Sequence, residues 1–415
     1  QNCDNVSLNS QAQIDAYAIN NGCSSITGQL SISGGDITNL DGLSQITAIG
    51  SIQISEAPLL TDFSGLDNVT SITGNVTITG TMSATLTNLF PSLTTVGDYI
   101  SLSGNTATSI SGFASVTSIG TGLGLDNMPN LTTLSGFGNL ATIGTGSGLG
   151  ISGNTSLTSL PAFSSLTSIG GPITFSSNAA LASVSGFNNL ASIDGVLNIY
   201  GNPNAVSISA FQNLTSINGY INVYDNAVLT SISGIGNINP ATINYIYLYS
   251  NPLLATCDVA SVCGYIANGG GTSYITGNAF GCENATQVSV TCGVSQNCTD
   301  ITLSSQAQID AFTVNYGCTS ITGTLTINGV DVTNLDGLSQ LTATGGLYIS
   351  EAPLLTDFSG LDNVTSITGN VTITGTVSSS LSNLFPSLAT VGGYISLSGN
   401  TATSISGFAS LISTG

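Results

Sequence analysis

Aliphatic residues return along this chain at a nearly constant spacing. Ten of them mark equivalent positions, and the nine steps from the first to the last cover 217 residues, or about 24 residues each. They are Ile26, Ile49, Ile72, Val96, Ile119, Ile143, Ile169, Ile193, Ile217 and Ile243. A period of about 20 to 29 residues is typical of leucine-rich repeats, which bury their apolar faces only by stacking. The spacing therefore predicts a solenoid of stacked coils.

Each repeat contains one short segment in which apolar and polar residues alternate. In 166–187 the alternation covers 173–176, Asn178 follows, and apolar residues then recur at every third position. Alternation indicates a strand with one buried face. Gly is frequent, with 51 residues, and Ser, Thr and Asn fill much of the rest, as expected for tight turns. We predict an all-β dominated fold, a right-handed β-solenoid of leucine-rich-repeat type with about 24 residues per coil, short capping helices and disulfides.

Stacked coils bring equivalent residues into columns. One column is aromatic and should form an internal stack: Phe113, Phe137, Phe163, Phe187 and Phe211. A second should form an Asn ladder in which each amide bonds the backbone of its own turn and its neighbours: Asn154, Asn178, Asn202, Asn226 and Asn251. Because the same position is Ala57 in an early coil, we expect the ladder only in the later coils, with a structural role.

Six of the 13 Tyr residues fall on three consecutive predicted strands. If the aliphatic residues of these strands face inward, their neighbours must face outward. These neighbours are Tyr200, Tyr220, Tyr224, Tyr245, Tyr247 and Tyr249. A Tyr cluster suits contacts with sugars or proteins, because each ring is apolar with a polar tip. The alternative is cross-strand stacking that only stabilises the sheet.

Both ends of the repeat array look like caps. Residues 10–20 read as a helix with Ser10 as N-cap, Gln13 completing a capping box, and Ile14 and Tyr17 on one face. Ser305 and Gln308 repeat this pattern. A second short helical pattern lies between Cys257 and Cys292. Caps of this kind cover the open ends of a solenoid.

Eight cysteines accompany these caps: Cys3, Cys23, Cys257, Cys263, Cys282, Cys292, Cys298 and Cys318. The chain has no His, and the spacings lack the close pairs of a four-Cys zinc site, so we expect disulfides and an oxidising compartment. Cys3 with Cys23 and Cys298 with Cys318 would pin the first helices. The four remaining cysteines allow three pairings, of which we favour Cys257 with Cys282 and Cys263 with Cys292.

The array itself is repeated at an offset of 295 residues. The segment from Glu56 returns at Glu351, and Cys3 and Cys23 return as Cys298 and Cys318. We therefore expect a complete module at 1–295, with an N-terminal cap at 1–25, coils at 26–256 and a Cys-rich C-terminal cap at 257–292. Residues 296–415 would be the N-terminal part of a second, near-identical module, and we expect the native polypeptide to continue.

The charge pattern excludes several functions. The chain has no Lys, Arg or His and 20 Asp and Glu residues, giving a net charge of −20. Binding to nucleic acid or to anionic membranes depends on Lys and Arg, so we expect neither. No apolar run reaches the length of a membrane span, so we expect no membrane insertion.

Little material for catalysis remains. Without His, Lys or Arg, only carboxylates and hydroxyls are available, and the paired candidates Asp62 and Asp67, copied as Asp357 and Asp362, are isolated from other acids. We expect no enzyme. Calcium-binding loop motifs are also missing, so we expect no metal site or cofactor beyond weak Ca²⁺ binding by scattered Asp.

The chain resembles the receptor L-domain-like, leucine-rich-repeat proteins of bacterial cell surfaces, especially those exported by type IX secretion. The resemblance rests on the LeuThrSerIle unit, the SerGlyPhe and AsnLeu steps and the end segment from Cys257 to Cys282, and it covers essentially the whole chain. It implies an L-domain-like fold and an extracellular or cell-surface location. Such repeats serve adhesion, surface layers and ligand capture alike, and the absence of Lys, Arg and His departs from typical members.

Two functions follow as hypotheses. The first is a non-catalytic structural or adhesive module of a long tandem-repeat surface protein or filament, with neighbouring copies of the same module as partners. The alternative is a receptor-like module that binds a glycan or peptide on its Tyr-bearing face.

Overall fold

The structure is a computed structural model that describes residues 2–160, 163–268, 273–294, 298–377 and 380–415. The chain divides into two compact units, Gln1–Ala285 (unit 1) and Thr286–Gly415 (unit 2). The module boundary expected at 295/296 lies outside the described residues. Helix α4 (Ala285–Thr291) falls almost entirely in unit 2, where Gln287 Nε2 donates to Asn315 Oδ1 at 3.4 Å. The boundary between the two compact units, at 285/286, therefore lies ten residues before the boundary of the sequence repeat, at 295/296.

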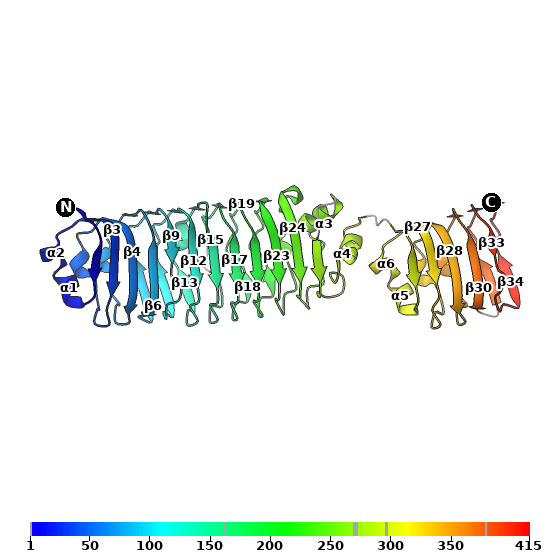
Figure 1. Cartoon of the computed structure of the whole chain (residues 1–415), viewed down its shortest axis with the longest axis horizontal. Helices are drawn as coiled ribbons and strands as arrows, with labels where there is room; N and C mark the ends of the chain where they lie inside the picture. Colours follow the sequence, from blue (N-terminus) through cyan, green and yellow to red (C-terminus); the bar gives the residue numbers. More distant parts are fainter. Residues whose placement is uncertain (1, 161–162, 269–272, 295–297, 378–379) are drawn as a thin grey trace. The chain divides into compact units, whose positions relative to one another are not determined.

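In the described part of unit 1, twenty strands form one sheet whose neighbouring strands all run parallel (Figure 1). The longer strands lie in one row: β2 (Val6–Leu8), β3 (Ser25–Ser33), β4 (Ala48–Ala57), β6 (Val76–Met82), β9 (Tyr99–Ser101), β12 (Gly122–Asp126), β15 (Gly148–Ser152), β17 (Ile173–Ser176), β20 (Leu197–Tyr200), β23 (Gly219–Tyr224), β24 (Ile243–Tyr249) and β25 (Ser273–Thr276). Paired residues such as Leu197 and Ile221 are equivalent positions of successive coils. A mostly β fold with a large parallel sheet is what the repeat predicts, and it is consistent with a solenoid.

A second row of two-residue strands runs beside the first and carries the aliphatic repeat. It contains β1 (Asn2–Cys3), β5 (Ser71–Ile72), β8 (Thr95–Val96), β11 (Ser118–Ile119), β14 (Thr142–Ile143), β16 (Ser168–Ile169), β19 (Ser192–Ile193) and β22 (Ser216–Ile217). Nine of the ten repeat residues, from Ile26 to Ile217, pair in register and are buried. Each residue inside this column is buried between the equivalent residues of the coils before and after it. The apolar area buried in this way stabilises the stacking of the coils.

The tenth repeat residue was wrongly placed by the spacing. Ile243 pairs with Gly219 and not with Ile217. The reason is a 3₁₀ turn, η5 (Pro240–Thr242), capped by the Asn239 side chain, which accepts from the Ala241 N–H. The Thr242 hydroxyl accepts the Ile217 N–H at 3.2 Å in place of a strand partner.

The opposite side of unit 1 carries the aromatic column and short strands. The Phe stack is confirmed, with successive ring centroids 5.0–5.9 Å apart, and it extends by one coil to Phe90. The strands on this side are β7 (Thr85–Leu89), β10 (Ser109–Gly112), β13 (Thr133–Ser135), β18 (Ser183–Val184) and β21 (Ser207–Ile208). The 3₁₀ turns of unit 1 besides η5 are η1 (Asp41–Leu43), η2 (Ser64–Leu66), η3 (Phe137–Asn139) and η4 (Ser233–Ile235).

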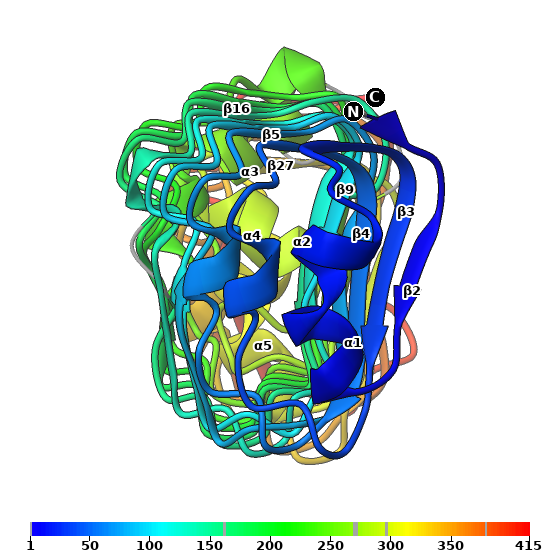
Figure 2. The ribbon, with the colours of Figure 1, turned by 90° about the vertical axis from the view of Figure 1, so that its left-hand side faces the viewer.

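The N-terminal end of unit 1 is covered by helices, as the capping pattern predicts (Figure 2). One helix was expected over 10–20, but the structure has two, α1 (Gln11–Asp15) and α2 (Tyr17–Asn20). Ser10 is the N-cap and accepts from the Gln13 N–H. The Gln13 side chain returns to the N–H of Asn9, one residue earlier than in a capping box. Ile14 and Tyr17 are buried.

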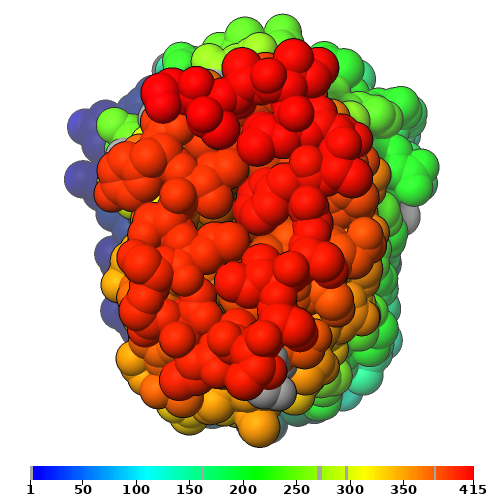
Figure 3. Space-filling model, turned by 90° about the vertical axis from the view of Figure 1, so that its right-hand side faces the viewer, coloured from blue at the N-terminus to red at the C-terminus, as the bar shows by residue number. Residues whose placement is uncertain are grey.

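Unit 2 repeats this arrangement. Besides α4, its helices are α5 (Gln306–Asp310) and α6 (Phe312–Asn315), and its 3₁₀ turns are η6 (Asp336–Leu338) and η7 (Ser359–Leu361). Its strands are β26 (Ile301–Leu303), β27 (Ser320–Ile327), β28 (Ala343–Ala352), β29 (Ser366–Ile367), β30 (Val371–Val377), β31 (Ser380–Leu384), β32 (Thr390–Val391), β33 (Ile395–Ser396), β34 (Ser404–Gly407) and β35 (Ser413–Thr414). The residues nearest Gly415 form the end face seen in Figure 3.

The Cys-rich end of unit 1 is built from helix α3 (Ala260–Ala267) and strand β25. Tyr265 on α3 is buried and its hydroxyl donates to the Asn244 carbonyl at 3.1 Å. Strand β25 pairs with β24 and adds one more parallel strand to the sheet. The end segment therefore extends the sheet as well as closing it.

Candidate ligand-binding face

Three of the six predicted Tyr residues form a tight column on the outer face of the sheet. Tyr200, Tyr224 and Tyr249 pair in register on β20, β23 and β24. Successive ring centroids are 4.6 Å apart and the planes differ by only 3° and 6°. Because each ring covers the face of the next, this column stabilises the sheet, and its three side chains are only partly exposed.

The other three predicted Tyr residues are arranged differently. Tyr220 and Tyr245 are 40% and 39% exposed, and their rings meet edge to face at 5.3 Å. Tyr247 lies beside both rings, with centroids 6.3 Å away in each case. Their aliphatic neighbours Ile221 and Ile246 are fully buried, as the alternation predicts. This group offers ring surface to solvent that the stacked column does not.

A seventh ring, Tyr274, joins this face and was missed by the sequence analysis. Tyr274 lies on strand β25, where it pairs with Tyr247 of β24. It is 52% exposed, and its ring meets the ring of Tyr249 edge to face at 5.5 Å. The Cys-rich segment was interpreted only as a cap. The sequence TyrIleThrGlyAsn at 274–278 does match the strand, Gly and Asn pattern of the preceding coils, so a signal was present. We call these seven residues the Tyr-bearing face.

Neutral polar side chains continue this face toward the N-terminus. Asn222 Nδ2 donates to Asn198 Oδ1 at 3.1 Å, and Asn198 Nδ2 lies 3.4 Å from Thr174 Oγ1. The Tyr200 column continues through Ser176 and Ser152 to Asp126. Burial raises the pKa of Asp126, opposed by hydrogen bonds from Ser152. Asp126 was not singled out from the sequence, because nothing in its spacing separates it from surface acids.

One edge of the Tyr-bearing face carries a carboxylate and a hollow. Asp225 and Ser250 follow the strands in the left-handed region, with φ of 53° and 54°. Together with Gly277 they line a cavity of about 470 Å³. The pKa values of Tyr224 and Tyr249 are raised first by burial and also by the negative charge of Asp225. The edge is therefore electronegative, and no cation of this chain compensates it.

The Asn column lies directly behind these strands, and its five predicted residues are fully buried. Asn226 shows the pattern: its Nδ2 donates to the carbonyls of Ile199 and Tyr224 at 3.1 and 3.0 Å. Its Oδ1 accepts the Asn202 N–H at 3.1 Å. Asn202 and Asn251 donate in the same way to Tyr200 and Tyr249. The column thus holds the carbonyls at the ends of the Tyr-bearing strands.

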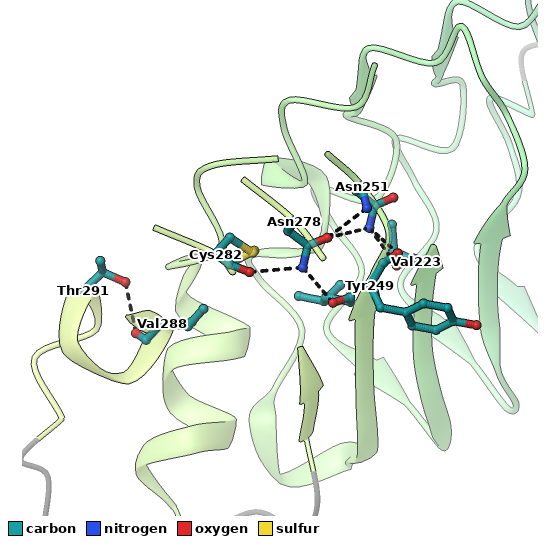
Figure 4. The surroundings of a disulfide bond; sticks show 9 residues. Val223, Tyr249, Asn251, Asn278, Cys282, Val288 and Thr291 are labelled. Atoms are coloured by element: carbon teal, nitrogen blue, oxygen red, sulfur yellow. Dashed lines mark hydrogen bonds between the residues drawn. A yellow bond between two sulfur atoms is a disulfide. The ribbon is translucent and has the colours of Figure 1, made fainter. Parts of the chain in front are cut away.

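The column continues into the Cys-rich end through Asn278, which the sequence analysis also missed. Asn278 Oδ1 accepts the Asn251 N–H at 3.1 Å, and its Nδ2 donates to the carbonyls of Leu248 and Cys282 (Figure 4). The step from Asn251 is 27 residues, longer than the steps of 24 and 25 before it, which hid the equivalence.

The cysteines are oxidised at both kinds of cap. Cys3 bonds to Cys23, Cys257 to Cys282 and Cys298 to Cys318, with Cα atoms 5.9, 5.5 and 6.2 Å apart. Cys263 and Cys292 are disulfide-bonded as well. The Cys257–Cys282 bond lies next to Asn278 and ties the segment that carries Tyr274 to the last full coil. Disulfides of this kind are typical of extracellular or surface proteins.

A comparison with known protein families identifies the family to which this fold belongs. The model of the receptor L domain matches residues 22–110, 167–258 and 317–411, more than half of the chain. The chain belongs to the receptor L domain family. Receptor L domains are ligand-binding, non-catalytic domains. No curated protein matches the sequence.

Within the L-domain match, the segment 167–258 contains the six Tyr residues singled out from the sequence. Tyr274 and Asn278 lie beyond it. The matched segments 22–110 and 317–411 are equivalent parts of the two copies. No helix among the described residues is long and apolar enough to cross a membrane.

The four carboxylates considered for catalysis are either hydrogen-bonded to the backbone of a 3₁₀ turn or partly buried. Asp62 Oδ1 accepts the N–H of Ser64, the first residue of η2, at 2.9 Å, and this bond lowers the pKa of Asp62. Asp357 does the same for Ser359 in unit 2. Asp67 and Asp362 each bury one carboxylate oxygen that has no hydrogen-bond partner. Across the ranges that the structure describes, no three Cys, Asp or Glu side chains gather as metal ligands.

Proposed function

We propose that this chain is a non-catalytic, extracellular ligand-binding protein whose unit 1 binds a glycan or peptide on the Tyr-bearing face. The observation that carries the proposal is the exposure of three rings, Tyr220, Tyr245 and Tyr274. Tyr220 and Tyr245 meet each other edge to face, and Tyr274 meets Tyr249 in the same way, so all three leave ring surface open to solvent. Rings with polar tips are suited to sugars and to protein contacts. The Asn198 and Asn222 amides and the Asp225 carboxylate add polar partners beside them. The proposal needs no cofactor.

The column of stacked Tyr rings and the buried Asn column both support this role by making the sheet rigid. A binding face works best when its side chains are held by a rigid scaffold. The amides of Asn202, Asn226 and Asn251 fix the strand ends, and the column of Tyr200, Tyr224 and Tyr249 restrains the sheet surface. These residues therefore position the exposed rings.

A second candidate function is a structural or adhesive module of a long surface protein or filament. The near-identical repeat at an offset of 295 residues favours it, because tandem copies extend a chain and can associate with neighbouring copies. A bacterial cell surface and export by type IX secretion belong to this proposal, as does a right-handed solenoid with about 24 residues per coil. Electron microscopy of the native protein tests it: compact single particles would contradict a filament.

The binding proposal is tested with the full chain on glycan and peptide arrays. Wild type should retain at least one ligand, and the variant Tyr245→Ser/Tyr274→Ser should bind it at least tenfold more weakly. Ile19→Ser is the matched control, because Ile19 is 87% exposed on α2, away from the Tyr-bearing face. A wild-type chain that binds nothing on either array, or a double variant that binds like wild type, would contradict the proposal.

A further inference from the structure

Unit 2 has a pocket of its own on the outer face of its sheet. The pocket has a volume of about 420 Å³ and is formed by β27, β28, β30 and the residues before β33. Its lining includes Thr324, Gly346, Tyr348, Asn370, Thr372 and Tyr394. Volumes of about 300–1,000 Å³ are usual for small-molecule sites. The pocket shares no residue with the Tyr-bearing face of unit 1.

The strand register explains how the pocket is built. Leu347 and Val371 pair and point into the core, so Gly346 and Tyr348 on one strand and Thr372 on the next face outward. Gly346 forms the floor: a Cβ there would have Thr324 Oγ1 at 3.1 Å and nothing else closer than 3.6 Å. Tyr348 stands beside this floor and is 39% exposed.

The corresponding surface of unit 1 carries larger side chains at two positions, Gln29 and Ser51. Residues 56–81 and 351–376 are identical in the two copies, yet the strand just before them changes at Ser51, Ile52 and Gln53, which become Gly346, Leu347 and Tyr348. In unit 1 Gln29 Nε2 donates to Gln53 Oε1 at 3.0 Å across the face, and Ser51 Oγ accepts the Asn75 N–H at 3.1 Å.

The changes in unit 2 are concerted. Gln29 is replaced by Thr324, Ser51 by Gly346 and Gln53 by Tyr348. The replacements of Gln29 and Ser51 shorten the side chains above Gly346. The replacement of Gln53 by Tyr348 puts an aromatic ring beside them in place of a flexible amide side chain. Stability of the sheet does not require them, since the same strands pair in the same register in both copies.

The chemistry of the lining restricts the ligand. No charged side chain lines the pocket, and the chain has no cation with which to hold an anion. Tyr348 and Tyr394 supply two aromatic rings, while Thr324, Thr372 and Asn370 supply neutral hydroxyl and amide groups. Asn370 Oδ1 accepts the Tyr394 N–H at 3.1 Å, which leaves its NH₂ group as a donor. A ligand with an apolar face and hydroxyls around its edge fits this combination.

We propose that this pocket of unit 2 binds a neutral hexopyranose unit of a glycan. The C–H face of the sugar packs on Tyr348, and its hydroxyls exchange hydrogen bonds with Thr324, Thr372 and Asn370. The copies have thus diverged in binding while keeping one fold. An acid beside the lining, Asp300, accepts the Thr324 N–H at 2.7 Å, so an amine-bearing sugar is the competing ligand to exclude.

The test uses the full chain on an array of neutral, acidic and amine-bearing hexose oligosaccharides, followed by calorimetric titration with the neutral tetrasaccharide retained best. The variant Thr324→Gln/Gly346→Ser/Tyr348→Gln gives unit 2 the residues that unit 1 already carries, so it should fold. We expect its Kd to rise at least tenfold, while Tyr348→Phe should stay within threefold of wild type.

The reciprocal variant Gln29→Thr/Ser51→Gly/Gln53→Tyr opens the same pocket in unit 1, and the stoichiometry for the tetrasaccharide should increase by one. Tyr245→Ser/Tyr274→Ser, which disables the Tyr-bearing face, should leave binding to unit 2 unchanged, so the two proposals can fail separately. Retention of no neutral glycan, retention of amine-bearing sugars alone, or wild-type affinity in the triple variant of unit 2 would overturn the inference.

Discussion

The two copies of the repeat, 1–120 and 296–415, show which positions of this fold are free to change. Their helices, 3₁₀ turns and strands correspond one to one along the described segments, and the inner columns of aliphatic residues are kept. Inside, the replacements are small, such as Tyr17 by Phe312 and Ile49 by Thr344. Outside, Gln53 gives way to Tyr348 and changes the chemistry of the surface. The core of a stacked coil thus limits each residue in size, whereas the outer face tolerates a change such as Gln to Tyr.

The largest expected effect concerns a column that the two copies lack. Both copies bond the N–H of Met82 or Val377 to a hydroxyl, Thr106 or Thr401, where the later coils of unit 1 use Asn. Asn226→Ala should cost about 3–5 kcal/mol, because it leaves several buried backbone and amide groups without partners.

Thr106→Ala is the comparison for this variant and should cost about 1–2 kcal/mol, since one N–H and one carbonyl lose a partner. Hydrogen exchange of the full chain, followed in segments 197–210 and 100–110, measures both losses. Equal costs would show that the Asn column contributes no more than the simpler hydroxyl bridge of the copies.

A second prediction exchanges the buried residues Ile49 and Thr344. Thr344 is 2% exposed and its hydroxyl has no hydrogen-bond partner, whereas Ile49 packs in the aliphatic column. Ile49→Thr should destabilise unit 1 by about 2–3 kcal/mol, and Thr344→Ile should stabilise unit 2 by about 1–2 kcal/mol. Hydrogen exchange separates the units, because segments 44–55 and 339–350 differ in sequence. Changes of the same sign in both variants would be inconsistent with this explanation.

A third prediction exchanges Tyr17 and Phe312. The Tyr17 hydroxyl is buried without a partner, and burial raises its pKa. Tyr17→Phe should stabilise unit 1 by about 1 kcal/mol at neutral pH, and Phe312→Tyr should destabilise unit 2 by a similar amount.

The pH dependence of the Tyr17 effect has a defined sign. A raised pKa means that the folded state keeps the proton longer, so stability falls as the pH rises above about 10, the value of an unfolded Tyr. The difference between wild type and Tyr17→Phe should therefore grow above that pH. Exchange in segments 11–20 and 306–315 reports it, and a difference that does not change with pH would contradict the assignment.

The smallest expected effect is shared by both copies. The carboxylates of Asp62 and Asp357 accept the N–H groups of Ser64 and Ser359 at the starts of η2 and η7, and these bonds lower the pKa of each carboxylate. Both side chains are almost fully exposed, so Asp62→Ala and Asp357→Ala should each cost less than about 1 kcal/mol. Because the folded pKa is lowered, this contribution is present above about pH 4 and is lost as the pH falls. Thermal unfolding at pH 7 and pH 2.5 tests this, and a cost that persists at pH 2.5 would argue against a role for the ionised carboxylate.

The sequence by itself determined the repeat and therefore the columns. The apolar spacing gave the inner positions of the strands, the Phe column and the Asn positions from 154 to 251, because a coil has one inward face and equivalent residues must stack on it. The cysteine positions likewise indicated the caps. The spacing failed at Ile243, because the 3₁₀ turn η5 shifts the strand register just before it, a change that a count along the chain does not reveal.

The outer surface was decided only by the tertiary structure. The alternation places six Tyr residues outside, but packing alone divides them into the closed column of Tyr200, Tyr224 and Tyr249 and the open group that includes Tyr245. The disulfide-tied end then adds Tyr274 and Asn278 by pairing β25 with β24. The local pattern at 274–278 matches the earlier coils, but the longer step of 27 residues from Asn251 hid this pairing. The pocket beside Tyr348 depends on neighbours from three strands. Inward residues must fit one core and so leave a regular trace in the sequence, whereas outward residues acquire their surroundings only when the coils are stacked.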